Sequence, residues 1–274
     1  MNIDRYLDRI GLDHRPPPTL AGLTELHRAH LLAVPYENLD VQLGRPVSIE
    51  RPAIFDKIVN RRRGGWCYEM NGILGWALGE LGFRVTRATG AVMREAAGEA
   101  VEANHLVLRV DLDEGVFLAD VGFGDGPLDP IRVAPGTFEG GGFRYELSQV
   151  DGRWWRFRNH PNGAAPSFDF DLNPADELRF AGKCQELQTA PDSHFVLNLF
   201  CFVRKPADTT LLLRGRVLRT ITPAGYSDRI LEGADDLVAT LRDDFSLDMP
   251  EAASLWPKIV ARHEQVMAQP GVGA

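Results

Sequence analysis

The stretch RRRGGWCYEMNG, residues 61–72, places a cysteine after two glycines and at the start of a long apolar stripe. The stripe predicts a helix that begins near Cys67 and stops at Gly82, because its apolar residues recur on one face. In the first turn of a helix, unpaired N–H groups and the positive helix end both stabilise a thiolate. Cys67 is therefore a candidate nucleophile, although for a lone cysteine on a helix a packing role is commoner.

Helical patterns also fill the chain before Cys67. Apolar residues at helical spacing predict helices over 3–10, 19–34 and 51–63, and Pro52 stands near the start of the third, where a missing N–H costs nothing. The first eighty residues are therefore expected to be helical.

From Phe83 the apolar period changes to two. Short runs rich in Val, Phe, Tyr and Trp over 83–94, 104–112, 115–123, 143–150 and 152–159 predict a mostly antiparallel sheet or barrel. The segment 159–175 is expected to be a turn-rich connection, followed by a helix over 174–187. Segment 193–203 fits either a helix or a strand. A hairpin over 209–222 and helices over 234–245 and 251–268 are predicted to close the chain.

A base for the thiol comes from the two runs that flank DLDE, residues 111–114. A hairpin that turns about Leu112 and Asp113 would place His105 directly opposite Asp120 on one face, near enough for a hydrogen bond. A three-residue turn would instead place Asp120 opposite Leu108, on the other face. Cys, then His, then Asp, with the cysteine opening a helix and the other two on a hairpin, is the layout of papain-like and transglutaminase-like thiol chemistry. The acyl group on Cys67 could then pass to water or to an amine.

The bulk composition excludes several other classes. A formal charge of −8 argues against a nucleic-acid surface, and the apolar runs are too short for a membrane span. Three cysteines without a CxxC pair fit a reducing compartment, and no compact Cys/His spacing suggests a metal site. The N-terminus lacks a signal-peptide pattern, so a cytoplasmic protein is expected.

At these residues the chain resembles the arylamine N-acetyltransferases. The matching motifs are VPYENLD (34–40), RGGWCYEMN (63–71), NHLVLRV (104–110) and DVGFGDG (120–126). The resemblance implies an α+β fold with a cysteine-protease-like core. A helical bundle over 1–83 would carry the nucleophile, an antiparallel β-barrel over 84–188 the His and Asp, and an α/β lid would span 189–274.

The resemblance also implies acetyl-coenzyme A as co-substrate, no metal or prosthetic group, and ping-pong turnover onto an arylamine or arylhydrazine. Cys67 would be the nucleophile, His105 the base and Asp120 the orienting acid. We expect a monomer or a weak homodimer. Two departures from the family pattern, Tyr36 for Phe and Asn104 before the histidine, concern only the coenzyme contacts.

Further site residues follow from the same resemblance. Phe123, Met93 and Phe202 are expected to line the acceptor pocket, although each also fits a plain core position. The coenzyme is expected near Asn104, Gly124 and Gly126, where glycines let backbone N–H groups approach it. Glu37 and Arg63 are expected to form a structural ion pair that holds the Cys67 loop.

Two other functions use the same residues. An amide synthase or thiol hydrolase would take another acyl donor on the same triad. A catalytically silent binding protein would keep the three residues for structure alone. Acetylation of Cys67 by acetyl-coenzyme A distinguishes acetyl transfer from both.

Overall fold

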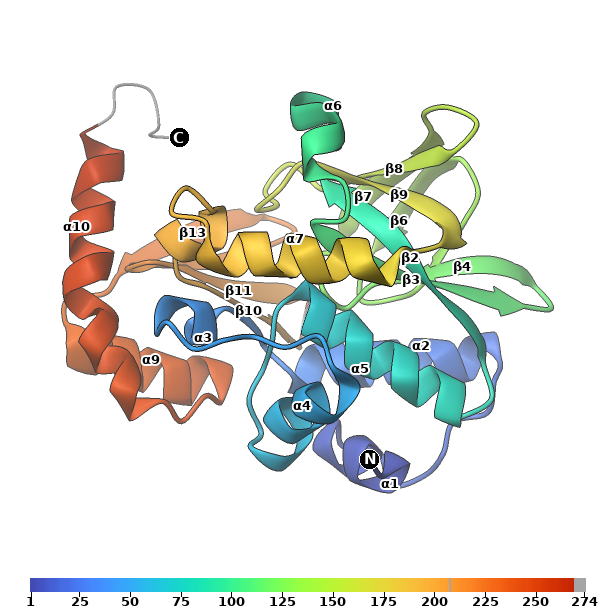
Figure 1. Cartoon of the computed structure of the whole chain (residues 1–274), viewed down its shortest axis with the longest axis horizontal. Coiled ribbons are helices and arrows are strands. Elements are labelled where there is room, and N and C mark those ends of the chain that lie inside the picture. Colours follow the sequence, from blue (N-terminus) through green and yellow to red (C-terminus); the bar gives the residue numbers. More distant parts are fainter. Residues whose placement is uncertain (207, 269–274) are drawn as a thin grey trace.

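The N-terminal part of the chain is a group of helices, as its periodicity predicts. The computed structural model describes residues 1–206 and 208–268 (Figure 1). Its first helices are α1 (Ile3–Arg9), α2 (Leu20–Ala33), α3 (Leu39–Gln42) and α4 (Arg51–Phe55), which runs on into a π-helical turn (Asp56–Asn60). Asn2 and Thr19 cap α1 and α2 by accepting backbone N–H groups of the first turn.

The predicted helix after Gly65 is α5 (Cys67–Glu80). It runs through the middle of the molecule, and most of its residues are buried on several faces (Figure 1). The chain leaves the helix at Gly82, whose φ of +87° suits glycine and matches the predicted stop.

Eight strands within residues 84–174 form one antiparallel sheet. Its strands are β2 (Arg84–Val92), β3 (His105–Leu112), β4 (Gly115–Ala119), β5 (Ile131–Arg132), β6 (Gly136–Gly140), β7 (Phe143–Gln149), β8 (Trp154–Arg158) and β9 (Ser167–Pro174). The spatial order is β5-β4-β3-β2-β9-β8-β7-β6. The sheet curls but does not close into the expected barrel, because β5 and β6 lie at opposite edges (Figure 1).

The expectation of a connection over 159–175 was wrong for its second half. Residues 167–174 are β9, which lies between β2 and β8 and is buried over Ser167–Asp171. Asp169 and Asp171 are tolerated in this strand because arginines pair with them, Arg156 Nε with Asp169 at 2.6 Å and Arg153 Nε with Asp171 at 2.6 Å.

A second antiparallel sheet joins both ends of the chain. Its order is β1 (Tyr36–Glu37), β10 (Phe200–Lys205), β11 (Thr209–Arg214), β12 (Val217–Thr222) and β13 (Gly225–Ile230). The predicted hairpin is confirmed as β11 and β12. The ambiguous segment divides into a short helix, α8 (His194–Leu197), and the strand β10.

The remaining helices connect and flank the two sheets. They are α6 (Arg94–Ala97) with a 3-10 turn (Gly98–Val101), α7 (Glu177–Thr189), α9 (Ala234–Phe245) and α10 (Trp256–Met267), preceded by a 3-10 turn (Pro250–Leu255). The helix expected over 251–268 thus begins as 3-10, with Pro257 in the first turn of α10. The last residues of the expected lid, 269–274, lie outside the described residues.

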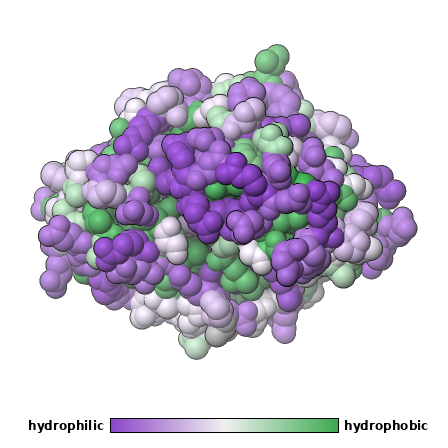
Figure 2. All heavy atoms as spheres, turned by 90° about the horizontal axis from the view of Figure 1, so that it is seen from below, coloured by the Kyte–Doolittle hydropathy of each residue, from purple (hydrophilic) through white to green (hydrophobic). Residues whose placement is uncertain are grey.

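Buried apolar side chains form three clusters. One fills the helical part and one face of β3 and β4, the second contains Cys67 and the inner face of the curled sheet, and the third lies under α9 and α10. On the face that carries α1 and α4, hydrophobic atoms show mainly in recesses between hydrophilic residues (Figure 2). Across residues 1–206 and 208–268, no helix combines the length and the apolar character that a membrane crossing requires.

Candidate active site

Three side chains meet where α5, β3 and β4 converge. Cys67 is the first residue of α5, His105 is the first of β3, and Asp120 directly follows β4. All three are almost completely buried. His105 Nε2 lies 2.7 Å from Asp120 Oδ2. Since the carboxylate occupies Nε2, the other ring nitrogen, Nδ1, is left for a thiol.

Neither predicted hairpin register is correct. Leu112 pairs with Gly115 and Leu108 with Ala119, so the two-residue turn is Asp113–Glu114, one position later than expected. Continued past the strand end, this register sets Asp120 diagonal to His105 rather than opposite it. Both still lie on one face, because the shift moves the pairing by two residues.

The pKa of His105 is raised to about 10. Burial opposes protonation of the ring, but the negative charge of Asp120 and hydrogen bonds to Asp120 and Cys67 outweigh it. For Asp120, burial is likewise outweighed by the charge and hydrogen bond of His105, so its pKa lies below the usual value. At neutral pH, His105 is thus an imidazolium, whose charge stabilises a thiolate beside it.

Asn71 holds the second oxygen of Asp120, and sequence reasoning missed it. Its Nδ2 donates to Asp120 Oδ1 at 2.7 Å and to the carbonyl of Leu106 at 2.6 Å. Its Oδ1 accepts the N–H of Val121 at 2.9 Å. One amide therefore links α5 to both arms of the hairpin. The available signal was spacing, since Asn71 lies four residues after Cys67 and so on the same helix face.

His27, on α2, supports Asp120 from behind and was also missed. Its Nε2 accepts the backbone N–H of Asp120 at 3.1 Å, while its Nδ1 lies 2.7 Å from the carbonyl oxygen of Leu128. Because a carbonyl can only accept, Nδ1 carries the proton and the ring is neutral. Burial, the dominant influence, lowers the pKa of His27, which agrees with this neutral form.

Two glycines allow close packing on the reactive side chains. A Cβ at Gly122 would lie 2.7 Å from Cys67 Cα and 3.0 Å from its Cβ. A Cβ at Gly90, which pairs with His105 across β2 and β3, would lie 2.9 Å from the ring carbon Cδ2. A side chain at either position would displace Cys67 or the imidazole of His105.

The glycines before Cys67 admit parts of the same chain. A Cβ at Gly64 would lie 2.0 Å from the carbonyl oxygen of Pro35, and one at Gly65 would lie 2.7 Å from Glu69 Cβ. Glu69 Oε2 in turn accepts the N–H of Trp66 at 3.2 Å, at the start of α5. These close approaches fix the loop that presents Cys67.

A buried charge cluster lies under this loop. Arg63 Nη2 is 2.6 Å from Glu37 Oε1, the pair expected from the sequence, and 3.3 Å from Asp40 Oδ1. Lys57 Nζ joins the cluster at 2.8 Å from Asp40 and 3.0 Å from Glu69. Burial raises the pKa of Glu69 to about 7 despite the charge of Lys57. The cluster ties β1, α3, the π-helical turn and α5 together.

The three residues expected in the acceptor pocket occupy different surroundings. The Phe123 ring centroid lies 6.0 Å from that of His105 and 4.8 Å from that of Phe168. Phe202, on β10, is buried against Tyr36. Met93 has a left-handed backbone (φ +65°) on the turn after β2, and the residue is 38% exposed. Phe123 therefore lies nearest to His105 of these three residues.

Some of the residues expected near the coenzyme make contacts within the chain itself. The side chain of Asn104 accepts the Val92 N–H at 2.8 Å and donates to the Val92 carbonyl at 3.2 Å. Its own carbonyl oxygen lies 3.7 Å from Cys67 Sγ. Gly124 has a φ of +95°, and a Cβ there would lie 3.0 Å from the Phe202 ring. Gly126 follows in the same buried loop, where its Cβ would lie 3.5 Å from Phe123.

Within the described residues, no group of His, Cys, Asp and Glu side chains could hold a metal ion. The chemistry open to this arrangement is that of a cysteine beside a protonated imidazole. Such a pair can accept an acyl group and move one proton.

Known proteins match nearly the whole chain. A family model described as N-acetyltransferase matches residues 19–254. The chain is 35% identical to the arylamine N-acetyltransferase of Mycolicibacterium smegmatis, with 92% of this chain and 94% of the relative covered. It is 34% identical to the arylamine N-acetyltransferase of Mycobacterium tuberculosis, with 100% and 99% covered.

A solved structure has the same fold and a bound coenzyme. That structure, of Mycobacterium marinum arylamine N-acetyltransferase in complex with CoA, matches with a TM-score of 0.85 at 32% identity and covers 97% of this chain and 99% of its own. The fold and these relatives define an N-acetyltransferase. More narrowly, the chain belongs to the arylamine N-acetyltransferase family, which confirms the family predicted from its four motifs.

Proposed function

We propose that this enzyme transfers an acetyl group from acetyl-coenzyme A to an arylamine, arylhydrazine or N-arylhydroxylamine through an acetyl-cysteine on Cys67. One observation carries the proposal. His105 lies 2.7 Å from Asp120 and also hydrogen-bonds to the buried thiol of Cys67 at the start of α5. We also propose that these residues act as they do in cysteine proteases. The chain then divides into a helical unit (1–83), a sheet unit (84–188) and an α/β lid (189–274).

In the first half of the reaction, the Cys67 thiolate attacks the carbonyl carbon of the acetyl thioester. The bond from that carbon to the coenzyme sulfur then breaks, and His105 gives its proton to the leaving sulfur. The backbone N–H of Cys67, in the first turn of α5, is a candidate donor to the oxyanion. The acetyl group is now on Cys67, and His105 is neutral.

In the second half, the amine nitrogen attacks the acetyl-cysteine carbonyl. Neutral His105 takes a proton from the nitrogen, the carbon–sulfur bond breaks, and the Cys67 thiolate returns beside an imidazolium. Asp120 keeps the ring oriented through both halves. We place Phe123, Met93 and Phe202 along the path of the acceptor, and Gly124, Gly126 and Asn104 along that of the coenzyme. Because the three cysteines are unpaired, we place the enzyme in the cytoplasm.

Intact mass after incubation with acetyl-coenzyme A alone tests the proposal. We expect one acetyl group per chain, located on Cys67 by peptide mapping. The variant Cys67→Ser should carry none, whereas Cys184→Ser, which removes a different buried thiol, should be acetylated normally. An unmodified wild-type chain would contradict the proposal, and adduct formation only with a carrier-bound acyl thioester would favour the amide synthase alternative.

A further inference from the structure

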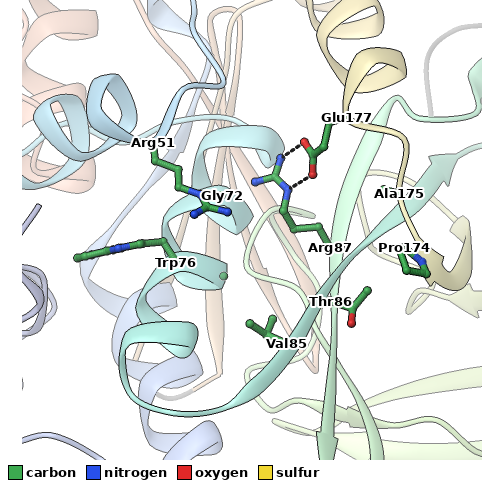
Figure 3. A pocket seen from close by; sticks show the side chains of 10 residues that line it. Arg51, Gly72, Trp76, Val85, Thr86, Arg87, Pro174, Ala175 and Glu177 are labelled. Atoms are coloured by element: carbon green, nitrogen blue, oxygen red, sulfur yellow. Dashed lines mark hydrogen bonds and ion pairs between the residues drawn. The ribbon is translucent and has the colours of Figure 1, made fainter.

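A pocket lined by none of the three triad residues opens beside α5. It has a volume of about 220 Å³ and lies between α4, α5, β2 and the segment that joins β9 to α7 (Figure 3). A pocket of this volume can hold a small organic molecule, since a cavity of about 150 Å³ is enough to bind benzene. Trp76, Val85 and Pro174 give it an apolar part.

Glycine keeps the wall formed by α5 open. A Cβ at Gly72 would lie 3.0 Å from Ile54 Cδ1 and 3.8 Å from Arg87 Nη1. Any larger side chain at this position would enter the pocket and block that nitrogen. The absence of a side chain therefore exposes Arg87 Nη1 to the pocket.

Arg87 presents a guanidinium group that is held in place. Its Nε and Nη2 lie 2.7 Å and 3.1 Å from the two carboxylate oxygens of Glu177, and its side chain is 18% exposed. The carboxylate thus fixes one edge of the group, and Nη1 faces Gly72. A fixed guanidinium loses little entropy when it binds an anion.

Arg51 supplies a second guanidinium group whose charge is not balanced. It is exposed at the start of α4, and no side chain among residues 1–206 and 208–268 pairs with it. Figure 3 shows Arg51 and Arg87 reaching toward Gly72 from opposite sides. Since Glu177 balances Arg87, the pocket carries about one positive charge, in a chain whose net charge is −8.

We propose that this pocket binds a small organic anion through a carboxylate or phosphate group. Arg51 and Arg87 Nη1 hold the anionic group, because guanidinium groups match the geometry of these oxyanions. The remainder of the ligand packs on Trp76, Val85 and Pro174. This anion site does not take part in the proposed acetyl transfer, so each of the two proposals can be tested without the other.

Isothermal titration calorimetry with inorganic phosphate and with benzoate tests the site on the full chain. We expect one saturable site per chain, and roughly tenfold weaker binding of both probes to Arg51→Ala. Arg84→Ala is the matched control, since Arg84 is 69% exposed on the same strand as Arg87 and does not line the pocket. Tighter binding of phosphate would assign a phosphate ester, and tighter binding of benzoate a carboxylate.

Wild-type protein alkylated at Cys67 with iodoacetamide should bind both probes as well as the untreated chain. Three results would overturn the proposal: no saturable binding at millimolar probe, equal binding by Arg51→Ala, or an equal loss in Arg84→Ala. Loss of binding on alkylation would show that the probes bind near Cys67 and not in this pocket. It would therefore also overturn the proposal. Both variants should fold, because Arg51 has no charged partner within residues 1–206 and 208–268, and Arg84 makes only an exposed ion pair with Asp113 at 3.7 Å.

Discussion

At the scale of single residues, the charge of Asp120 decides the protonation of His105. In Asp120→Asn that charge is lost while burial remains, so the pKa of His105 should fall and the imidazole should be neutral at pH 7. We expect alkylation of Cys67 by iodoacetamide at pH 7 to slow by roughly tenfold or more. The measurement is the pH profile of the alkylation rate.

Asp129→Asn is the control for this experiment. Asp129 lies in the loop after the triad aspartate, is 44% exposed and pairs with Arg28. Its removal should leave the alkylation profile unchanged. An unchanged profile for Asp120→Asn would show that the Asp120 carboxylate does not control the protonation of His105.

His27 provides a second test at this scale. The change His27→Ala leaves the N–H of Asp120 and the carbonyl of Leu128 without their partner, which should destabilise the protein by about 1–3 kcal/mol per group. We expect kcat to fall as Asp120 loses its support, with partial rescue in His27→Gln, whose amide can still accept from Asp120. Chemical denaturation and the pH profile of kcat/KM measure the two effects. Equal kcat in the alanine variant and the wild type would limit His27 to stability.

The sequence predicts that Cys67, His105 and Asp120 lie together, as they do in the structure, but it does not reveal the residues that support them, for a physical reason. Cys67, His105 and Asp120 stand in local patterns, a helix start and a hairpin. Their face was predictable even though the register was not, because side chains alternate along a strand. His27 reaches Asp120 across 93 residues of chain, and only the folded structure brings them together.

At the scale of elements, the contact between α5 and the loop after β4 sets the position of the nucleophile. The change Gly122→Ala places a Cβ 2.7 Å from Cys67 Cα, so one of the two must move. Since small misplacements of reacting groups have large effects, we expect kcat/KM to drop about a hundredfold. A steady-state assay with an arylamine and acetyl-coenzyme A measures it.

Gly79→Ala is the matched glycine control. It lies on α5 itself, and a Cβ there meets no atom within 4 Å. It should keep full activity and raise the free energy of unfolding by about 0.5–1 kcal/mol, because alanine favours a helix. Full activity in Gly122→Ala would show that the loop after β4 can move without displacing Cys67, and would contradict the prediction.

Elements with a clear period were predictable, and those stabilised by distant partners were not. The helix α5 and the strands β2, β3, β7 and β8 follow their apolar patterns. Strand β9 carries aspartates at alternate positions, which disfavour a strand until Arg153 and Arg156 pair with them. The edge strands β5, which has two residues, and β13 carry no strong pattern of their own.

At the scale of the whole molecule, the charge on His105 links the active site to stability. Its pKa is about 10 in the folded chain and near 6.5 in the unfolded chain. The folded state therefore binds the proton more tightly. This contribution is full below pH 6.5 and is lost as the pH rises through 10.

We expect the free energy of unfolding of the wild type to fall between pH 7 and pH 10 more steeply than that of His105→Gln. Urea denaturation across this range measures the difference. Parallel curves for the two proteins would show that His105 is not charged in the folded chain. Cys67→Ala, which keeps the pair of His105 and Asp120, should retain most of the slope.

The two-residue strand β1 has a consequence for when this protein can fold during its synthesis on the ribosome. Tyr36 and Glu37 emerge early, yet they pair with Phe202 and Cys201 of β10, and Asn38 Oδ1 accepts the N–H of Phe200, 162 residues later. The loop that holds Cys67 lies against β1, through the Tyr36 and Gly65 pairing. The nucleophile therefore cannot reach its final surroundings until most of the chain has been made. A half-finished chain should hold a thiol that is present but not yet reactive.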